Sequence, residues 1–220
     1  MSIQTNNIWD EMIVRLLSRA KLKEEKSQLI INTALKVFAE KGYDNATIAD
    51  IAKSAKVSMG LPLYYFSNKE ELACQALELS SDQITNSILN AVTGNSPEEI
   101  STSLINAFRK NIRLYPDFYP FYFEMWSASR RNKKIKRVFK TALDNTINAT
   151  KEILINSQKR GCLSIGLEDI ESISISLVSK VDGLGLMLIQ YPQLIENENI
   201  WRMAKKMCLS VLDNKIEDLK

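Results

Sequence analysis

Residues 47–72, TIADIAKSAKVSMGLPLYYFSNKEEL, decide the fold that we expect for this 220-residue chain. Thr47 stands before an apolar-periodic run and has Asp50 three residues later, which is the pattern of a capping box at a helix start. Segment 55–57 ends this helix as a tight turn, and Ser58 is placed to cap a second short helix. Two short helices around such a turn predict a helix-turn-helix, whose second helix enters the major groove of DNA.

The side chains at the start of the second helix are expected to face base edges. Apolar residues of both helices should fill the space between them. Tyr65 and Phe66 are better explained as a core plug that joins the two domains than as base contacts. The residues expected between the two helices are Ile48, Ile51, Val57 and Leu63.

The motif is part of a longer pattern. From residue 29 the chain reads LIINTALKVFAEKGYDNATIADIAKSAKVSMGLPLYYFSNKEEL. In order, this is an apolar helix, a Gly-aromatic pair, a threonine, a helix ending in paired small residues, Val-Ser-x-Gly, Tyr-Phe and Lys-Glu-x-Leu. Over roughly Lys26 to Leu72 the chain resembles the TetR family of dimeric transcriptional repressors. The resemblance implies an all-α fold in which a helix-turn-helix domain precedes a larger helical bundle for ligand binding and dimerisation.

The chain departs from the family pattern within the second helix. Leu63 replaces a tyrosine that binds phosphate in the family, and Tyr64, in place of the usual histidine, keeps one donor nearby. Pro62 removes an early backbone hydrogen bond and should shorten or distort the start of the helix. Lys69 is implied to meet a phosphate at the next helix start, although a solvated surface lysine is the alternative. The residues expected to contact DNA are Thr47, Ser58, Met59, Gly60, Leu61, Tyr64 and Lys69.

Composition fits a soluble helical protein. The chain is 45% hydrophobic and 25% charged, and its net charge of +3 is too small by itself to indicate nucleic acid. Cys74, Cys162 and Cys208 are widely spaced, which suits reduced thiols in the cytoplasm. No apolar stretch approaches the roughly 20 residues that span a bilayer, and the start of the chain lacks a signal peptide. We therefore expect a cytoplasmic protein with no membrane partner.

Apolar periodicity of three and four predicts helix nearly throughout the chain. Residues 1–22 form an N-terminal extension with an extra helix, whose apolar stripe includes Trp9 and Leu17; we expect the stripe to dock on the DNA-binding domain, with a partner surface or fraying as alternatives. Residues 23–67 form the helix-turn-helix domain, and 68–220 the ligand-binding and dimerisation domain. The expected helices span about 27–41, 47–54, 68–92, 97–114, 118–131, 133–160, 168–190 and 197–213.

The segment 115–126 is dense in aromatic residues. In TetR-like proteins the larger bundle encloses a ligand pocket, and one face of this helix is a candidate lining. Ordinary helix core without a cavity is the alternative. Glu124 is expected at the surface, with a pocket acid as the alternative, and the basic run 130–140 is expected to be a solvated face. The candidate pocket residues are Phe118, Tyr122, Met125 and Trp126.

Asp182 to Gly185 interrupt a strongly apolar helix, where each glycine costs about 1 kcal/mol relative to alanine. Close approach of another helix is the simplest compensation. In the TetR family the last two long helices of each subunit form the dimer interface, whereas burial in the monomer's own core is the alternative. The interface candidates are Val181, Leu184, Leu188, Trp201, Met207 and Val211.

Enzyme functions are disfavoured because the chain contains no histidine. A Ser-His-Asp triad, a His-containing zinc site and a Glu-x-x-His di-iron site are therefore excluded. No glycine-rich phosphate loop is present either, so we expect no catalytic residues, no metal and no cofactor.

The sequence thus predicts a homodimer that binds a near-palindromic double-stranded DNA operator and is released by a small-molecule effector. Two alternatives remain open. One is a DNA-bound scaffold with a protein partner. The other is a helical small-molecule-binding or catalytic protein that has lost specific DNA binding.

Overall fold

The computed structural model describes the backbone of residues 4–213 and the side chains of residues 14, 15 and 17–213. All regular structure in this range is helical, which confirms the all-α class. Contacts divide the chain into a unit that ends at Ala76 and a unit that begins at Leu77. The division therefore lies inside a helix, whereas the sequence placed it after residue 67.

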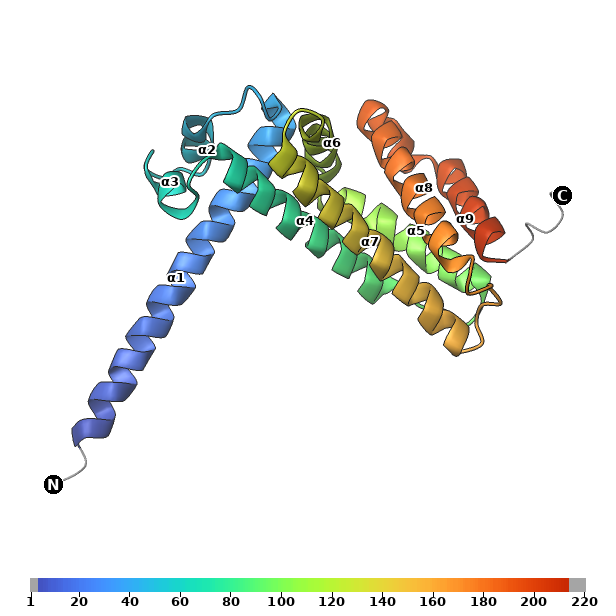
Figure 1. The fold of residues 1–220 in the computed structure, drawn as a ribbon, viewed down its shortest axis with the longest axis horizontal. Helices are drawn as coiled ribbons and strands as arrows, with labels where there is room; N and C mark the ends of the chain where they lie inside the picture. The colour runs from blue at the N-terminus through green and yellow to red at the C-terminus, as the bar shows by residue number, and fades with distance from the viewer. Residues whose placement is uncertain (1–3, 214–220) are drawn as a thin grey trace. The chain divides into compact units, whose positions relative to one another are not determined.

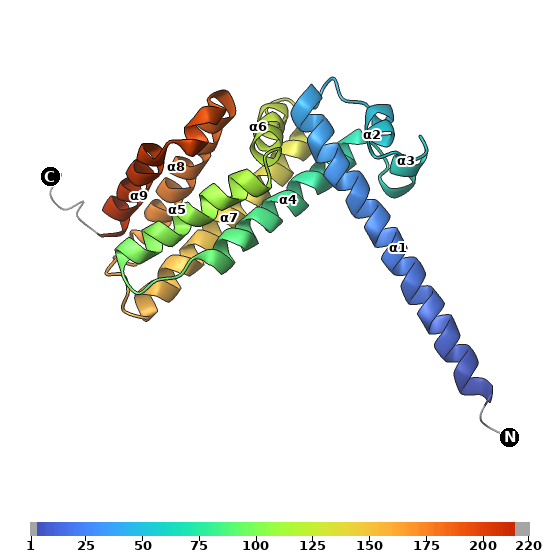
Figure 2. The same cartoon turned by 180° about the vertical axis from the view of Figure 1, so that it is seen from behind.

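The first unit contains three helices and the start of a fourth (Figure 1). The extra helix expected in residues 1–22 is not separate but is the first half of one long helix, because neither glycine nor proline interrupts the chain from residue 4 to residue 41. In Figure 2 this half extends beyond the short helices of the unit. The elements are α1 (Gln4–Lys41), α2 (Ile48–Ser54), α3 (Leu61–Tyr65) and the start of α4 (Lys69–Ala91).

The described side chains of the α1 extension face solvent. Those from Val14 to Lys26 are exposed, and full burial begins at Ile30. Most of the apolar stripe expected to dock, Trp9 included, lies outside the described side chains. Leu17, the member that is described, is exposed.

The core of the first unit forms where α1, α2 and α3 meet. Phe38 of α1, Ile51 of α2 and Phe66 after α3 are almost completely buried, whereas Tyr65, the other residue of the expected core plug, is only half-buried. Gly42 ends α1 with a positive φ of 78°, the left-handed conformation that glycine adopts without strain. Leu63, expected between the two short helices, is 51% exposed.

The second unit consists of the remainder of α4 and five further α-helices, most of which begin and end within two residues of the predicted limits. Side chains of Ser96, Asn132 and Asn197 accept hydrogen bonds from the first free backbone N–H groups of three of these helices. The elements are α5 (Pro97–Leu114), α6 (Phe118–Ser129), α7 (Lys133–Lys159), α8 (Ile170–Gln190), the short 3-10 helix η1 (Pro192–Glu196) and α9 (Glu198–Leu212).

Helices α6 and α8 approach unusually closely. A Cβ added at Gly185 would lie 2.5 Å from Cε1 of Tyr119, so only glycine admits the ring at this place. One turn further along α6 and one turn back along α8, the Tyr122 hydroxyl donates a hydrogen bond of 3.2 Å to Asp182. The two helices therefore run antiparallel, and Gly185 shows the close approach that the sequence predicted.

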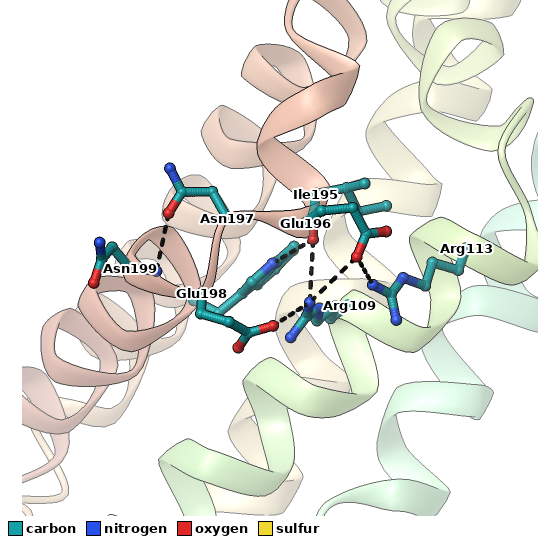
Figure 3. Close-up of polar contacts among 8 residues, drawn as sticks. Arg109, Arg113, Ile195, Glu196, Asn197, Glu198 and Asn199 are labelled. Carbon is teal, nitrogen blue, oxygen red and sulfur yellow. Dashed lines mark hydrogen bonds and ion pairs between the residues drawn. The ribbon is translucent and has the colours of Figure 1, made fainter.

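An ionic cluster fixes η1 and the start of α9 to α5 (Figure 3). The Arg109 guanidinium donates to Glu198 at 2.6 Å and to the Ile195 carbonyl oxygen at 3.3 Å, and it also lies over the Trp201 ring. Arg113 pairs with Glu196 at 2.6 Å. Trp201 donates its indole N–H to the same carbonyl as Arg109, at 2.8 Å, and is buried. This cluster places Trp201 in the core of the unit.

Helix α8 is, by length and composition alone, apolar enough to cross a bilayer, which corrects the expectation that no such stretch exists. A core helix of a water-soluble protein passes the same test. Because α8 packs against α6 and α7 and carries both Lys180 and Asp182, we interpret it as a core helix.

The two glycines of α8 give a matched test of the helix contact. Gly185→Ala should lower the free energy of unfolding by about 1–3 kcal/mol, because the added methyl group overlaps the Tyr119 ring. Gly183→Ala meets nothing within 4 Å and should raise it by up to about 1 kcal/mol through helix propensity. Urea unfolding of both variants at one protein concentration measures the difference; equal effects would contradict the close approach.

Candidate functional site

The capping box predicted at the start of α2 is present. The backbone N–H of Asp50 donates to the Thr47 hydroxyl oxygen at 3.1 Å, and the Thr47 N–H donates back to the Asp50 carboxylate at 3.0 Å. Lys41 at the end of α1 also donates to this carboxylate, at 2.6 Å. Hydrogen bonds from Lys41 and then Thr47 lower the pKa of Asp50 to about 2. The Thr47 hydroxyl donates to Asp50 as well, so its only hydrogen is already engaged.

The second short helix starts later than expected. Gly60, not Ser58, is its N-cap residue, and Ser58 instead accepts a 3.0 Å hydrogen bond from the Leu61 N–H through its carbonyl oxygen. The cause is Pro62, which occupies the first turn, where a missing N–H is tolerated and a fixed φ suits the helix. Helix α3 is consequently only five residues long, in agreement with the shortening predicted from the proline.

The face of α3 that is open to solvent is apolar and aromatic. Met59, Leu63 and Tyr64 are all more than half exposed, while Leu61 is half-buried. Lys53 on α2 and Lys56 in the turn are also exposed and supply positive charge to the helix-turn-helix. Base contacts from this face would thus be apolar, apart from the Tyr64 hydroxyl.

Lys69 has a structural role that the sequence did not reveal. Its ammonium group donates to the carbonyl oxygens of Tyr43, Asp44 and Ala46 at 2.7, 3.1 and 3.0 Å. It also lies 4.7 Å from the centre of the Tyr43 ring. Three hydrogen bonds use all three ammonium hydrogens, so in this structure Lys69 holds the loop between α1 and α2 and has none left for a phosphate.

A separate cavity of about 70 Å³ lies inside the second unit, between α4, α5, α6, α7 and α8. Asp182 is the one charged side chain among its described lining residues. The Ser81 hydroxyl, also in the wall, is buried and has no hydrogen-bond partner within the described chain. Three aromatic residues, Phe118, Tyr119 and Tyr122, line one part, and Ile84, Ile88, Leu104, Ile153, Leu177 and Val178 contribute aliphatic surface.

The cavity alters the ionisation of its polar groups. Burial raises the pKa of Asp182 to about 6, although the hydrogen bond from Tyr122 partly opposes the rise. Burial and then the Asp182 charge raise the pKa of Tyr119 and of Tyr122 well above the usual tyrosine value. Near neutral pH the cavity therefore holds a carboxylate beside two protonated phenols.

Two of the four predicted pocket residues line this cavity. Phe118 and Tyr122 do, whereas Met125 is fully buried elsewhere in the core and Trp126 is 51% exposed. Met125 and Trp126 lie outside this cavity because its contact with α6 ends at Tyr122, so the remaining turns of the helix meet core or solvent. Their assignment to a ligand pocket stays a prediction. Glu124 is half-buried and does not belong to the described lining.

An apolar groove of about 300 Å³ runs along α8 and α9. Val181, Leu184 and Met207, three of the predicted interface residues, line it, and Met207 is 49% exposed. Leu188, Trp201 and Val211, the other three, are buried in the unit's own core, which leaves them little surface for a partner. Other lining residues include Met187, Met203 and Ile200.

Comparison with known proteins agrees with the geometry of the first unit. The family model described as bacterial regulatory proteins, tetR family, matches residues 30–76, from the first buried turn of α1 to the end of the unit. The HTH-type transcriptional regulator YuxN of Bacillus subtilis, described as uncharacterized, is 40% identical over 96 residues, which cover 43% of this chain and 33% of YuxN. Residues 30–76 therefore form a TetR-family DNA-binding domain.

A second TetR-type relative is the biofilm operon icaADBC HTH-type negative transcriptional regulator IcaR of Staphylococcus aureus. It is 37% identical over 60 residues, which cover 27% of this chain and 32% of IcaR. The match thus spans about a third of the length of each of these curated relatives.

The TetR fold extends through both units of the chain. The crystal structure of the transcriptional regulator FadR from Bacillus subtilis in complex with stearoyl-CoA matches with a TM-score of 0.71 at 19% identity. The match covers 84% of this chain and 98% of FadR. At this identity the likeness shows the fold.

The sequence did not single out two polar residues of this TetR-family cavity, Asp182 and Ser81. Asp182 is an acid inside the apolar helix 173–189, which is a pattern that indicates a buried polar site. The neighbouring glycines favoured an interpretation in terms of helix packing instead. Nothing in the sequence distinguishes Ser81 from the adjoining Ser80. Its place in the cavity wall depends on the rotation of α4.

Lys69→Met tests whether this lysine stabilises the TetR-family head. The variant should lose about 2 kcal/mol of unfolding free energy, because charged hydrogen bonds to half-buried loop carbonyls are removed. Lys53→Met, a matched change at an exposed lysine of α2, should stay within about 0.5 kcal/mol of the parent. Chemical denaturation measures the unfolding free energy of both variants. A K69M variant as stable as K53M would show that Lys69 does not stabilise the fold and is an ordinary surface lysine.

Proposed function

We propose that the chain is a transcriptional repressor that binds a near-palindromic operator as a homodimer and is released when a small molecule occupies the cavity of its second unit. The observation that carries the proposal is that the chain contains both features. One unit has a recognition helix with solvent-exposed side chains, and the other has an apolar cavity that contains a carboxylate. A site that reads DNA and a separate site for a ligand are the two parts that a ligand-responsive regulator requires.

Relatives support the two halves of this proposal separately. IcaR is described as a negative regulator of transcription, and its match supports repression. FadR is bound to stearoyl-CoA, which supports ligand binding by the shared fold. We further infer that the protein acts in the cytoplasm, where it meets its operator.

Dimerisation is proposed through the groove along α8 and α9. Its described lining is apolar except for Lys180, and Met187, Met203 and Met207 are each nearly half exposed. Methionine side chains adapt to a facing surface and are enriched at contacts between proteins.

Release follows a two-state mechanism. The dimer presents two recognition helices, which must be about 34 Å apart to enter successive major grooves. A ligand shifts the population only if it binds better to the conformation in which this spacing is wrong. Helix α4 belongs to both units and contributes Ser81, Ile84 and Thr85 to the cavity, so it is the element that we expect to carry the change.

The direct test is binding of the purified full chain to fragments of its own genomic DNA at near-physiological salt, followed by sequencing of the retained pool. Recovery of one palindromic motif is expected. Weak, sequence-independent and salt-sensitive retention would contradict the repressor and favour a helical protein that has lost specific DNA binding.

Leu63→Tyr should strengthen operator binding. The side chain at this position is exposed on α3, and a tyrosine hydroxyl there would supply the phosphate contact that the family pattern contains. One added hydrogen bond to a phosphate is worth about 1 kcal/mol, or about fivefold in affinity. Fluorescence anisotropy with the recovered motif measures the gain, and Tyr64→Phe, which removes the neighbouring hydroxyl, should produce a loss. Unchanged affinity in both variants would place DNA contact elsewhere.

Met207→Glu should weaken the dimer. A carboxylate placed in the apolar groove would be desolvated without a partner on dimerisation, which should raise the dimer dissociation constant by at least about tenfold. Leu114→Glu, at an equally exposed apolar residue of α5 outside the groove, is the control and should leave the dimer intact. Sedimentation equilibrium distinguishes the two; a fully dimeric M207E protein would reject this interface.

A further inference from the structure

The cavity of the second unit contains a negative charge that favours cationic ligands over anionic ones. Asp182 is its one charged described lining residue, and no lysine or arginine belongs to that lining. An anionic head group would meet a carboxylate and no counter-charge there. A ligand that carries a positive charge, in contrast, would find its partner already present.

Three aromatic rings line the same cavity as this carboxylate. The Tyr122 hydroxyl donates to Asp182 at 3.2 Å, the Phe118 ring stacks on Tyr122 with a centroid separation of 5.6 Å, and the Tyr119 ring lies edge-on at 6.1 Å. Aromatic faces attract cations, and groups of such rings bind substituted ammonium ions. A cavity lined by a carboxylate and three rings is therefore suited to an ammonium group.

The carboxylate itself lacks compensation within the described chain. Asp182 is half-buried, accepts one side-chain hydrogen bond from the described residues, and forms no ion pair with them. A charge placed in an apolar wall with a single hydrogen bond costs free energy, which a bound cation would offset.

The rest of the wall suits an apolar chain. Leu177 and Val178 lie about one turn before Asp182 on α8, roughly 6 Å along the helix axis. Ile88 of α4 and Ile153 of α7 also line the cavity. The Ser81 hydroxyl, which is buried without a partner in the described chain, is available to one further polar atom.

We infer that the effector is a hydrophobic amine or quaternary ammonium compound, whose cationic head lies against Asp182 and the Phe118, Tyr119 and Tyr122 rings while its apolar chain follows the aliphatic wall. This inference rests on the proposed function, since it names the ligand class of the same cavity. It assigns to Asp182 a binding role and to Tyr122 the positioning of that carboxylate.

The assignment requires a defined dependence on pH. The titratable side chains that line the cavity with Asp182 are Tyr119 and Tyr122 of α6, and both stay protonated near neutral pH and below. The described lining residues from α4, α5 and α7 include no titratable side chain. Lys180 of α8 lines the α8–α9 groove instead. A permanent cation should bind fully above pH 6 and lose affinity as the pH falls and Asp182 becomes protonated.

The test uses three probes with the same eight-carbon chain, namely octyltrimethylammonium, octanoate and 1-octanol, titrated into the full-length protein by calorimetry above and below pH 6. The cation should bind more tightly than the alcohol, and octanoate most weakly. Asp182→Asn, which keeps the shape and removes the charge, should weaken cation binding about tenfold or more and leave octanol unchanged. Tyr122→Phe should keep cation binding but move its pH midpoint upward, because the hydrogen bond that lowers the carboxyl pKa is lost.

Tighter binding of octanoate than of the cation, or equal binding of the cation by wild type and D182N, would overturn the inference. If D182N does not fold, the pH titration of the wild-type protein decides alone. Operator binding without cation binding would reject the proposed class of ligand but would still support the proposed repressor function. Cation binding without any operator would support the ligand class and reject the repressor.

Discussion

The absence of a side chain at residue 185 is the constraint on which the second unit depends. Because a Cβ there would overlap Tyr119, α6 and α8 reach a separation that other residues would prevent. The antiparallel crossing then places Tyr122 opposite Asp182, one turn away on each helix. The close contact between α6 and α8 thus places the Asp182 carboxylate next to the Tyr122 ring. A polar site therefore forms as a result of helix packing.

Local chemistry made most of the fold predictable. Helix limits follow from caps, glycines and prolines, which act over a few residues and can be read directly from the sequence. Thr47 with Asp50 starts α2 as expected, and the ends of α5 match the predicted limits of 97 and 114. Where two local rules competed, at Ser58 and Pro62, the proline's preference for the first turn prevailed and the serine cap did not form.

The sites were less predictable because they depend on which helices meet. From the sequence, a lysine at a helix start can be interpreted either as a phosphate ligand or as a surface charge. The structure shows that the carbonyl oxygens of residues 43, 44 and 46 all accept hydrogen bonds from Lys69. Trp201 and Met207 lie on one helix, yet the first is buried by Arg109 and Phe108 while the second is open. Periodicity identifies an apolar face, but it does not show whether the same chain or another copy covers it.

The bonds of Lys69 have a mechanical consequence for any signal that passes along α4. They tie the first turn of that helix to the loop between α1 and α2, at the opposite end of α2 from the turn that leads to α3. Bending between Phe66 and Lys69 would stretch all three hydrogen bonds together, so this junction is stiff. A displacement of α4 should therefore move α2 and α3 as one body, and the flexible part of α4 that the proposed release mechanism requires must lie beyond Lys69.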